Sequence, residues 1–225
     1  MLPEGLFFDF DGVIADTELP WLECAARFCR ARGQNVALEA LLPYLGDGDE
    51  GLLRFVSARC GLPPDAILAA MRPDFAEATR SLGLRPGIGR YLDWAAGADL
   101  RLALVSNSSD AYIDRWLRRL GLVGRFHAVV TRSSGLAMKP APDMYCSAAQ
   151  TLGVEPRRVV CIEDSPMGLR SALAAGLMAA AYPNDRLEQG VADLGVPVID
   201  LAREVPEAML RRVIDHYAAN RGAGP

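Results

Sequence analysis

Two aspartates, Asp9 and Asp11, follow the apolar run 6–8 near the start of this chain of 225 residues. Side chains two residues apart on an extended chain point to the same side, so a buried strand here would deliver both carboxylates together. Gly12 then allows the backbone to turn sharply beside them. Two like charges held close are unfavourable unless a cation joins them or one carboxyl takes a proton. The pattern therefore indicates a divalent-metal site or an acid–base pair, although an ordinary turn has the same residue types.

The segments that must position these aspartates alternate between strand-like and helical patterns from residue 85 onward. Apolar runs predict strands at 100–105, 128–131, 158–162, 178–182 and 197–199, and helical patterns occupy 88–96, 110–120, 143–152, 166–175 and 204–219. Such alternation predicts a parallel sheet covered on both faces, with ligands bound outside the carboxyl ends of its strands. Ser106 and Asn107 follow one predicted strand, and Glu163 and Asp164 follow another. Three polar clusters would therefore share one edge of the sheet.

Residues 17–84 have a different character, because none of their patterns is typical of a strand. Helical spacing covers 18–32, 38–45, 51–60 and 66–81, and Pro73 is expected to kink or split the last of these helices. We therefore expect an α/β fold. Its Rossmann-like parallel-sheet core would comprise residues 1–16 and 85–225, and an all-helical cap domain would be inserted at 17–84.

The composition limits the possible partners. Hydrophobic residues make up 51% and charged residues 23% of the chain, and the net charge of −4 argues against a nucleic-acid or acidic-membrane partner. We see neither a signal peptide nor an apolar run of about 20 residues that could span a membrane. The five cysteines include no CxxC pair, which favours reduced thiols and a cytoplasmic location. Among 24 cationic residues only Lys139 is a lysine.

Four short motifs occur in order along the chain: DFDGV at 9–13, VSNSS at 105–109, MKPAPDMY at 138–145 and IEDSPMG at 162–168. Together they resemble the motifs of the haloacid dehalogenase superfamily. The helical insertion after the first motif resembles the branch that contains β-phosphoglucomutase and many small phosphatases. The resemblance implies that Asp9 is a nucleophile that forms an aspartyl-phosphate, and that Asp11 is the general acid and base.

The same resemblance implies a Mg²⁺ ion, which would relieve the repulsion between a phosphate dianion and the aspartates. Its ligands would be the Asp9 carboxylate, the Asp11 backbone carbonyl and the Asp164 carboxylate, with Glu163 tuning the site from behind them. An N-cap role before helix 166–175 is the alternative for Asp164.

The remaining motif residues would bind the transferring phosphoryl group. The Ser106 hydroxyl and the backbone N–H groups around Asn107 would donate to its oxygens, and Lys139 would supply a fixed positive charge. An alternative for the serines of this motif is a turn or N-cap before helix 110–120, which we expect for Ser108 and its two successors.

The cap residues bear on which member of the family this is. In mutases of this branch a histidine lies three residues after the glutamate that matches Glu18, and Trp21 occupies that position here. The histidines His127 and His216 are expected to be structural. We therefore expect a Mg²⁺-dependent phosphatase for a small phosphomonoester such as a sugar phosphate. The alternatives are a phosphomutase and, more remotely, a non-catalytic binding protein on the same fold.

The cap would close over the core about hinges near residues 17 and 84–86. Candidates for contact with the leaving group are Trp21, Gly46 and Asp47, although Trp21 also suits a core position. A monomer fits the size of the chain.

Overall fold

The computed structural model describes residues 2–44, 49–183, 191 and 193–220. Internal contacts divide the chain into two compact units. The larger contains Met1–Ala15 and Leu84–Pro225, and the smaller contains Asp16–Gly83.

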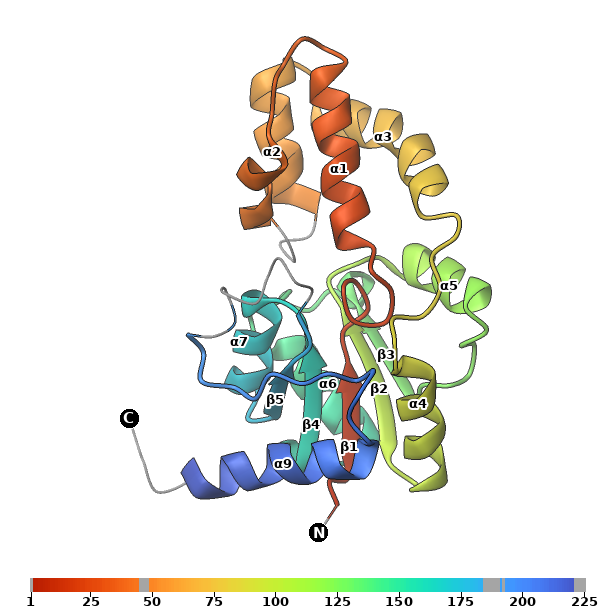
Figure 1. Ribbon diagram of the computed structural model, residues 1–225, viewed down its shortest axis with the longest axis vertical. Coiled ribbons are helices and arrows are strands. Elements are labelled where there is room, and N and C mark those ends of the chain that lie inside the picture. The colour runs from red at the N-terminus through yellow and green to blue at the C-terminus, as the bar shows by residue number, and fades with distance from the viewer. Residues whose placement is uncertain (1, 45–48, 184–190, 192, 221–225) are drawn as a thin grey trace. The chain divides into compact units, whose positions relative to one another are not determined.

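The larger unit is built on a five-stranded parallel sheet with the order β3-β2-β1-β4-β5 (Figure 1). The strands are β1 (Gly5–Phe8), β2 (Arg101–Ser106), β3 (Ala128–Thr131), β4 (Val159–Glu163) and β5 (Met178–Ala181). The expectation of an α/β, Rossmann-like core is confirmed.

Helices cover both faces of this sheet (Figure 1). The helices of this unit are α4 (Ile88–Gly97), α5 (Asp110–Arg119), α6 (Asp143–Leu152), α7 (Pro166–Ala174) and α9 (Pro206–Ala219), with short 3-10 turns η3 (Arg132–Ser134) and η4 (Pro156–Arg158). Helix α6 packs on β2 and β3 and α7 packs on β4 and β5, while α4 and α9 contact each other and the sheet. Because strand side chains alternate, Phe7, Val105 and Cys161 lie in one core with residues of α6 and α7.

The prediction of a strand at 197–199 is wrong, because this segment makes only an isolated bridge between Ala181 and Val198. The Ala181 N–H donates to the Pro197 carbonyl and the Ala181 carbonyl accepts from Ile199, both at 2.8 Å. The Asp200 N–H then donates to the Glu204 side chain at 2.8 Å, so the backbone turns away before a second pair can form.

The smaller unit contains three helices that pack on one another: α1 (Glu18–Arg30), α2 (Asp49–Cys60) and α3 (Pro64–Ala78). The prediction of a helix at 38–45 is wrong for the residues that the structure describes. They form two 3-10 turns, η1 (Leu38–Ala40) and η2 (Leu42–Tyr44). Pro43 lies in the second turn and has no N–H for an α-helical bond. Pro73, in contrast, lies inside α3 without splitting it, on the exposed side.

Gly87 is the N-cap of α4 and provides a test of the packing in the larger unit. Its φ is +87°, and a Cβ at this position would lie 1.9 Å from the Leu201 carbonyl oxygen. Gly87→Ala should lower the free energy of unfolding by about 2–4 kcal/mol, because it adds left-handed strain and a clash with backbone. Gly89→Ala is the control, since its Cβ would meet only Leu84 at 3.6 Å. Urea unfolding should show the control equal to wild type or about 0.5–1 kcal/mol more stable. A Gly87→Ala protein as stable as wild type would contradict the packing.

Candidate active site

The register of the sheet places Asp9 beside a second acidic residue. Asp9 is the first residue after β1, and its N–H donates to the Ile162 carbonyl at 3.1 Å. Phe8 is paired with Leu104 on β2 and with Ile162 on β4. One residue further along both strands, Asp9 therefore lies beside Glu163, the last residue of β4. The carboxyl edge of the sheet brings these two acids together although they are far apart in sequence.

The ammonium group of Lys139 lies between the two acids. It donates to Asp9 Oδ1 at 2.6 Å, to Glu163 Oε1 at 2.6 Å and to the Val105 carbonyl at 2.8 Å. Its side chain is only 4% exposed. The Tyr145 hydroxyl, from α6, also donates to Glu163 Oε1. The ammonium therefore has three fixed acceptors, and Glu163 is held by a lysine and a tyrosine.

The backbone of Lys139 is held by the side chain of Asn107. The Lys139 N–H donates to Asn107 Oδ1 at 3.0 Å, and Asn107 Nδ2 donates to the Lys139 carbonyl at 3.3 Å. The following bond, to Pro140, is cis. Because the Asn107 amide group is used here, its side chain orients the lysine loop. The sequence predicts a part in phosphate binding for Asn107 and gives no sign of this pairing.

A third acid completes a cluster at this edge. Ligand oxygens of Asp9, Glu163 and Asp164 lie within 4.8 Å of one another, and all three residues are buried. A Cβ at Gly12 would lie 1.8 Å from Asp164 Oδ2, so any residue other than glycine at position 12 would clash with this carboxylate. These three buried carboxylates, two of them bonded to one ammonium, form a donor set suited to a hard divalent cation. The residues therefore fit the metal that the sequence predicts.

The charge balance of the cluster appears in two pKa shifts. Burial raises the pKa of Asp9 to about 8; Lys139 opposes this rise, while Glu163 and Asp11 add to it. Burial by itself would lower the pKa of Lys139, but Asp9 and Glu163 outweigh burial and raise it. Both pKa values rise: that of Asp9 mainly because burial disfavours its charged form, and that of Lys139 because the neighbouring carboxylates favour its charged form. A bound cation would oppose both rises.

The Asp11 carboxylate accepts hydrogen bonds from a different set of residues. Its Oδ2 accepts from the Ser108 hydroxyl at 2.7 Å, and its Oδ1 accepts from the Tyr112 hydroxyl at 2.9 Å. The Ser106 hydroxyl lies 3.4 Å from Oδ2 and accepts from the Ser108 N–H at 3.0 Å. The expectation that Ser108 merely forms a turn or cap is therefore wrong, because its hydroxyl binds Asp11. Tyr112 was missed altogether, since a tyrosine in the first turn of a helix is no signal by itself.

The idea that both aspartates leave one extended strand side by side needs correction. Strand β1 ends before Asp9, and the Phe10 carbonyl accepts from the N–H groups of Ile14 and Ala15. This tight loop ends the alternation of an extended chain, so Asp9 and Asp11 acquire separate partners. Asp11 nevertheless contributes to the raised pKa of Asp9, which places the two carboxylates in electrostatic contact.

The helix that follows the fourth motif is capped by Ser165. Its hydroxyl accepts from the Gly168 N–H at 3.2 Å. Asp164 is therefore not the N-cap of α7, and its carboxylate belongs to the acidic cluster.

The remaining candidates are Trp21, Gly46, Asp47 and the two histidines. Within the smaller unit, the Trp21 ring packs edge-on against Phe75 with centroids 5.2 Å apart, and its contact with a substrate stays a prediction. Gly46 and Asp47 lie outside the described residues. His127 Nδ1 accepts from the Leu102 N–H at 3.0 Å, and His216 contacts Asn220, which fits the structural roles expected for both histidines.

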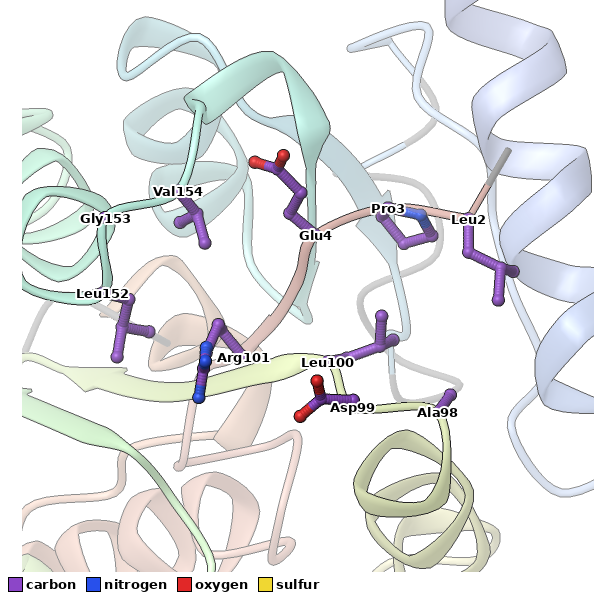
Figure 2. Close-up of a pocket in the computed structure, with 10 residues that line it drawn as sticks. All are labelled: Leu2, Pro3, Glu4, Ala98, Asp99, Leu100, Arg101, Leu152, Gly153 and Val154. Carbon is purple, nitrogen blue, oxygen red and sulfur yellow. The ribbon is translucent and has the colours of Figure 1, made fainter.

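A hollow of about 430 Å³ lies at the opposite edge of the sheet (Figure 2). Residues 2–4, 98–101 and 152–154 line it, which places it where β1 and β2 begin. Its Glu4 is already paired with Arg158 and accepts from the Glu155 N–H. None of the motif residues lines this hollow, so it is separate from the acidic cluster.

Comparison with known proteins decides the family. Residues 6–182 match the model of the haloacid dehalogenase-like hydrolases. The chain belongs to this family. Among relatives, the fructose-1-phosphate phosphatase YqaB of Escherichia coli K12 is 30% identical over 186 residues, which cover 78% of this chain and 94% of YqaB. The β-phosphoglucomutase of Bacillus subtilis 168 is 27% identical over 195 residues, covering 78% and 81% of the two chains. Family membership confirms the resemblance drawn from the four motifs and the expectation of a hydrolase.

A solved structure of a family member agrees with the fold. It is an Asp-to-Asn mutant of CbbY from Rhodobacter sphaeroides in complex with xylulose-(1,5)-bisphosphate. It matches with a TM-score of 0.75 and 27% identity, over 90% of this chain and 96% of that one. Among the described residues, no helix combines the length and apolar character that a membrane crossing needs.

The acidic cluster predicts a stability that depends on pH and cation. The pKa of Asp9 rises from its ordinary 3.8 to about 8 in the cation-free fold, so protonated Asp9 favours folding. This contribution is complete below about pH 4 and is lost as the pH rises through about 8. Thermal unfolding of EDTA-treated protein should therefore occur at lower temperature at about pH 8.5 than at about pH 6. Added Mg²⁺ should raise the unfolding temperature more at the higher pH, because protons and cation compete for the carboxylate.

Asp9→Asn is the matched control for this measurement. It removes the titrating carboxyl at similar volume, and both the decline with pH and most of the Mg²⁺ effect should disappear. A wild-type protein that Mg²⁺ does not stabilise at either pH would contradict a cation site in the cluster.

Proposed function

We propose that this hydrolase is a Mg²⁺-dependent phosphatase that cleaves a small phosphomonoester through an aspartyl-phosphate on Asp9. The observation that carries the proposal is the buried ion pair of Asp9 and Lys139 beside Glu163 and Asp164. A carboxylate fixed by an ammonium group at the carboxyl edge of a parallel sheet is placed where ligands of such sheets bind. Family membership and a phosphatase among the relatives support the same reaction.

The chemistry needs two carboxylates with different tasks. An oxygen of Asp9 forms a bond to phosphorus while the bond from phosphorus to the leaving oxygen breaks. Asp11 gives a proton to that oxygen and then takes a proton from the water that hydrolyses the aspartyl-phosphate. The separate partners of the two residues suit this division: Asp9 is bonded to a cation, whereas Asp11 is held by neutral hydroxyl groups.

Mg²⁺ would be held by the carboxylates of Asp9 and Asp164 and by the backbone carbonyl of Asp11. When bound, the ion offsets the negative charge of the phosphate and polarises its oxygens. Glu163 has a supporting part in this proposal, since its Oε1 already accepts from Lys139 and Tyr145. The narrow place that Gly12 leaves for Asp164 supports the assignment.

The transferring phosphoryl group would be bound by the Ser106 hydroxyl and by backbone N–H groups near Asn107, and Lys139 would supply a fixed positive charge. Donors of this kind stabilise the charge on the equatorial oxygens in the transition state. The contacts of Lys139 fix the position of its ammonium group, and the Asn107 side chain orients its backbone. A charge that is held rigidly needs little reorganisation during the reaction.

The substrate we propose is a sugar phosphate or a similar small metabolite. YqaB is named for fructose 1-phosphate, and the CbbY structure contains xylulose-(1,5)-bisphosphate. Residues 17–84 would form a cap that closes over the core, with Trp21, Gly46 and Asp47 as candidates for contact with the sugar. No nucleic-acid or membrane partner is part of this proposal, and a cytoplasmic monomer stays a prediction.

A phosphomutase is the second candidate, because a β-phosphoglucomutase is among the relatives. Trp21 favours hydrolysis, since it takes the place where the resemblance to mutases requires a histidine. A mutase must return the phosphoryl group to a bound sugar, whereas a phosphatase gives it to water.

Phosphate release tests the proposal. A panel of sugar phosphates with Mg²⁺ should give free phosphate, and EDTA should abolish it. Asp9→Asn should lower kcat by about 10⁴-fold or more, because no nucleophile remains.

Lys139→Arg should lower kcat by about 10²-fold or more, because a planar guanidinium cannot replace the compact ammonium.

Two outcomes would contradict the proposal. Near wild-type turnover by Asp9→Asn would exclude the covalent route. Conversion of β-glucose 1-phosphate to glucose 6-phosphate without release of phosphate would favour the mutase.

A further inference from the structure

Both carboxylate oxygens of Asp11 are held by hydroxyl groups from one short segment. Tyr112 donates to Oδ1 at 2.9 Å and Ser108 donates to Oδ2 at 2.7 Å. The two donors lie just before and within the first turn of α5. Rotation of the Asp11 carboxylate would break at least one of these bonds, so the pair fixes its orientation as well as its position.

The tyrosine is itself held in place by aromatic packing. Its ring meets Phe10 edge-on at 6.2 Å between centroids and Trp116 at 6.3 Å. Phe10 is fully buried and lies between the two aspartates in the chain. Packing of Phe10 against α5 therefore determines the distance from the Tyr112 hydroxyl to Asp11.

We propose that Tyr112, together with Ser108, is a positioning residue that holds Asp11 for proton transfer. This inference rests on the proposed function, in which Asp11 is the general acid and base. Proton transfer requires heavy atoms about 2.6–3.2 Å apart, and a shift of about 1 Å can cost about 10²-fold in rate. A carboxylate on a loop next to the nucleophile needs such restraint.

Hydroxyl groups suit an acid that must gain and lose a proton. A hydroxyl donates to an ionised carboxylate, and after rotation of its hydrogen it can accept from a protonated one. A lysine or arginine has no acceptor and would hold only the ionised form. The Lys139 ammonium is bonded to Asp9, and the Ser108 and Tyr112 hydroxyl groups donate to Asp11. These partners suit a nucleophile that attacks as a carboxylate and an acid that gains and loses a proton.

Leaving groups of different basicity test the role of Tyr112. Phenyl phosphate and p-nitrophenyl phosphate have similar shapes, but phenolate is the more basic leaving group and needs a proton more. General acid catalysis contributes about 10²–10⁴-fold, so loss of one restraint on Asp11 should cost about tenfold where protonation matters. In Mg²⁺-containing buffer, Tyr112→Phe should lower kcat/KM about tenfold for phenyl phosphate and less than about threefold for p-nitrophenyl phosphate. Tyr112→Phe keeps the ring and its packing.

Tyr217→Phe is the matched control. It removes another hydroxyl with two hydrogen bonds, at 3.0 and 2.8 Å to the backbone of Ala179 on β5. It should change kcat/KM for neither substrate. A double-mutant cycle adds a second readout: in an Asp11→Asn background, Tyr112→Phe should have no further effect on phenyl phosphate, because the group it positions is gone.

The outcomes separate the two claims. Suppose that wild type hydrolyses both aryl phosphates and that Asp9→Asn hydrolyses neither. If Tyr112→Phe then lowers kcat/KM by the same factor for the two compounds, or leaves both values unchanged, the positioning role is wrong and the proposed function stands. A full effect of Tyr112→Phe in the Asp11→Asn background would also overturn the role. If wild type releases phosphate neither from these compounds nor from the panel of sugar phosphates under any metal condition, the proposed function fails and this inference fails with it.

Discussion

The structure depends on a buried excess of negative charge. Asp9, Glu163 and Asp164 lie within 4.8 Å of one another, and the neighbouring cation is Lys139. Burial of unbalanced charge is unfavourable, and the raised pKa of Asp9 is its direct expression. A fold keeps such a cluster only when something besides its own stability requires it. A divalent cation balances the charge, and the same arrangement then attracts a phosphate group that the carboxylates alone would repel.

The rest of the larger unit holds this cluster in place. The register of β1 against β4 sets Asp9 beside Glu163, and α6 brings Tyr145 to the same carboxylate. Asn107 holds the backbone of Lys139 from the end of β2. The opposing charges are thus fixed by backbone pairing and by neutral polar side chains. Asp11 follows a separate design, with hydroxyl partners and an aromatic support. Two carboxylates two residues apart therefore have different surroundings, which suits different chemical tasks.

The fold class and the family could be predicted from the sequence, because each motif follows an apolar run and the runs alternate with helical patterns. The acidic cluster could be predicted for the same reason, since the carboxyl ends of parallel strands meet at one edge. The hydroxyl partners of Asp11 could not. Tyr112 is 101 residues away in the chain, and its contact depends on how α5 packs against Phe10. The amide pairing of Asn107 with Lys139 likewise depends on tertiary geometry. The turns around Pro43 differ from expectation because proline has no N–H for an α-helical bond. The single bridge at Val198 differs because the bond from Asp200 to Glu204 turns the backbone away.

The central claim is that Asp9 becomes covalently phosphorylated, and locating the phosphoryl group tests it most directly. Protein mixed with Mg²⁺ and a sugar phosphate that it turns over is quenched in acid, and borohydride then reduces an acyl-phosphate to an alcohol. Peptide mass spectrometry should find homoserine in place of aspartate at residue 9 and at no other aspartate. Reduction at Asp11, or turnover with all aspartates unmodified, would contradict the account.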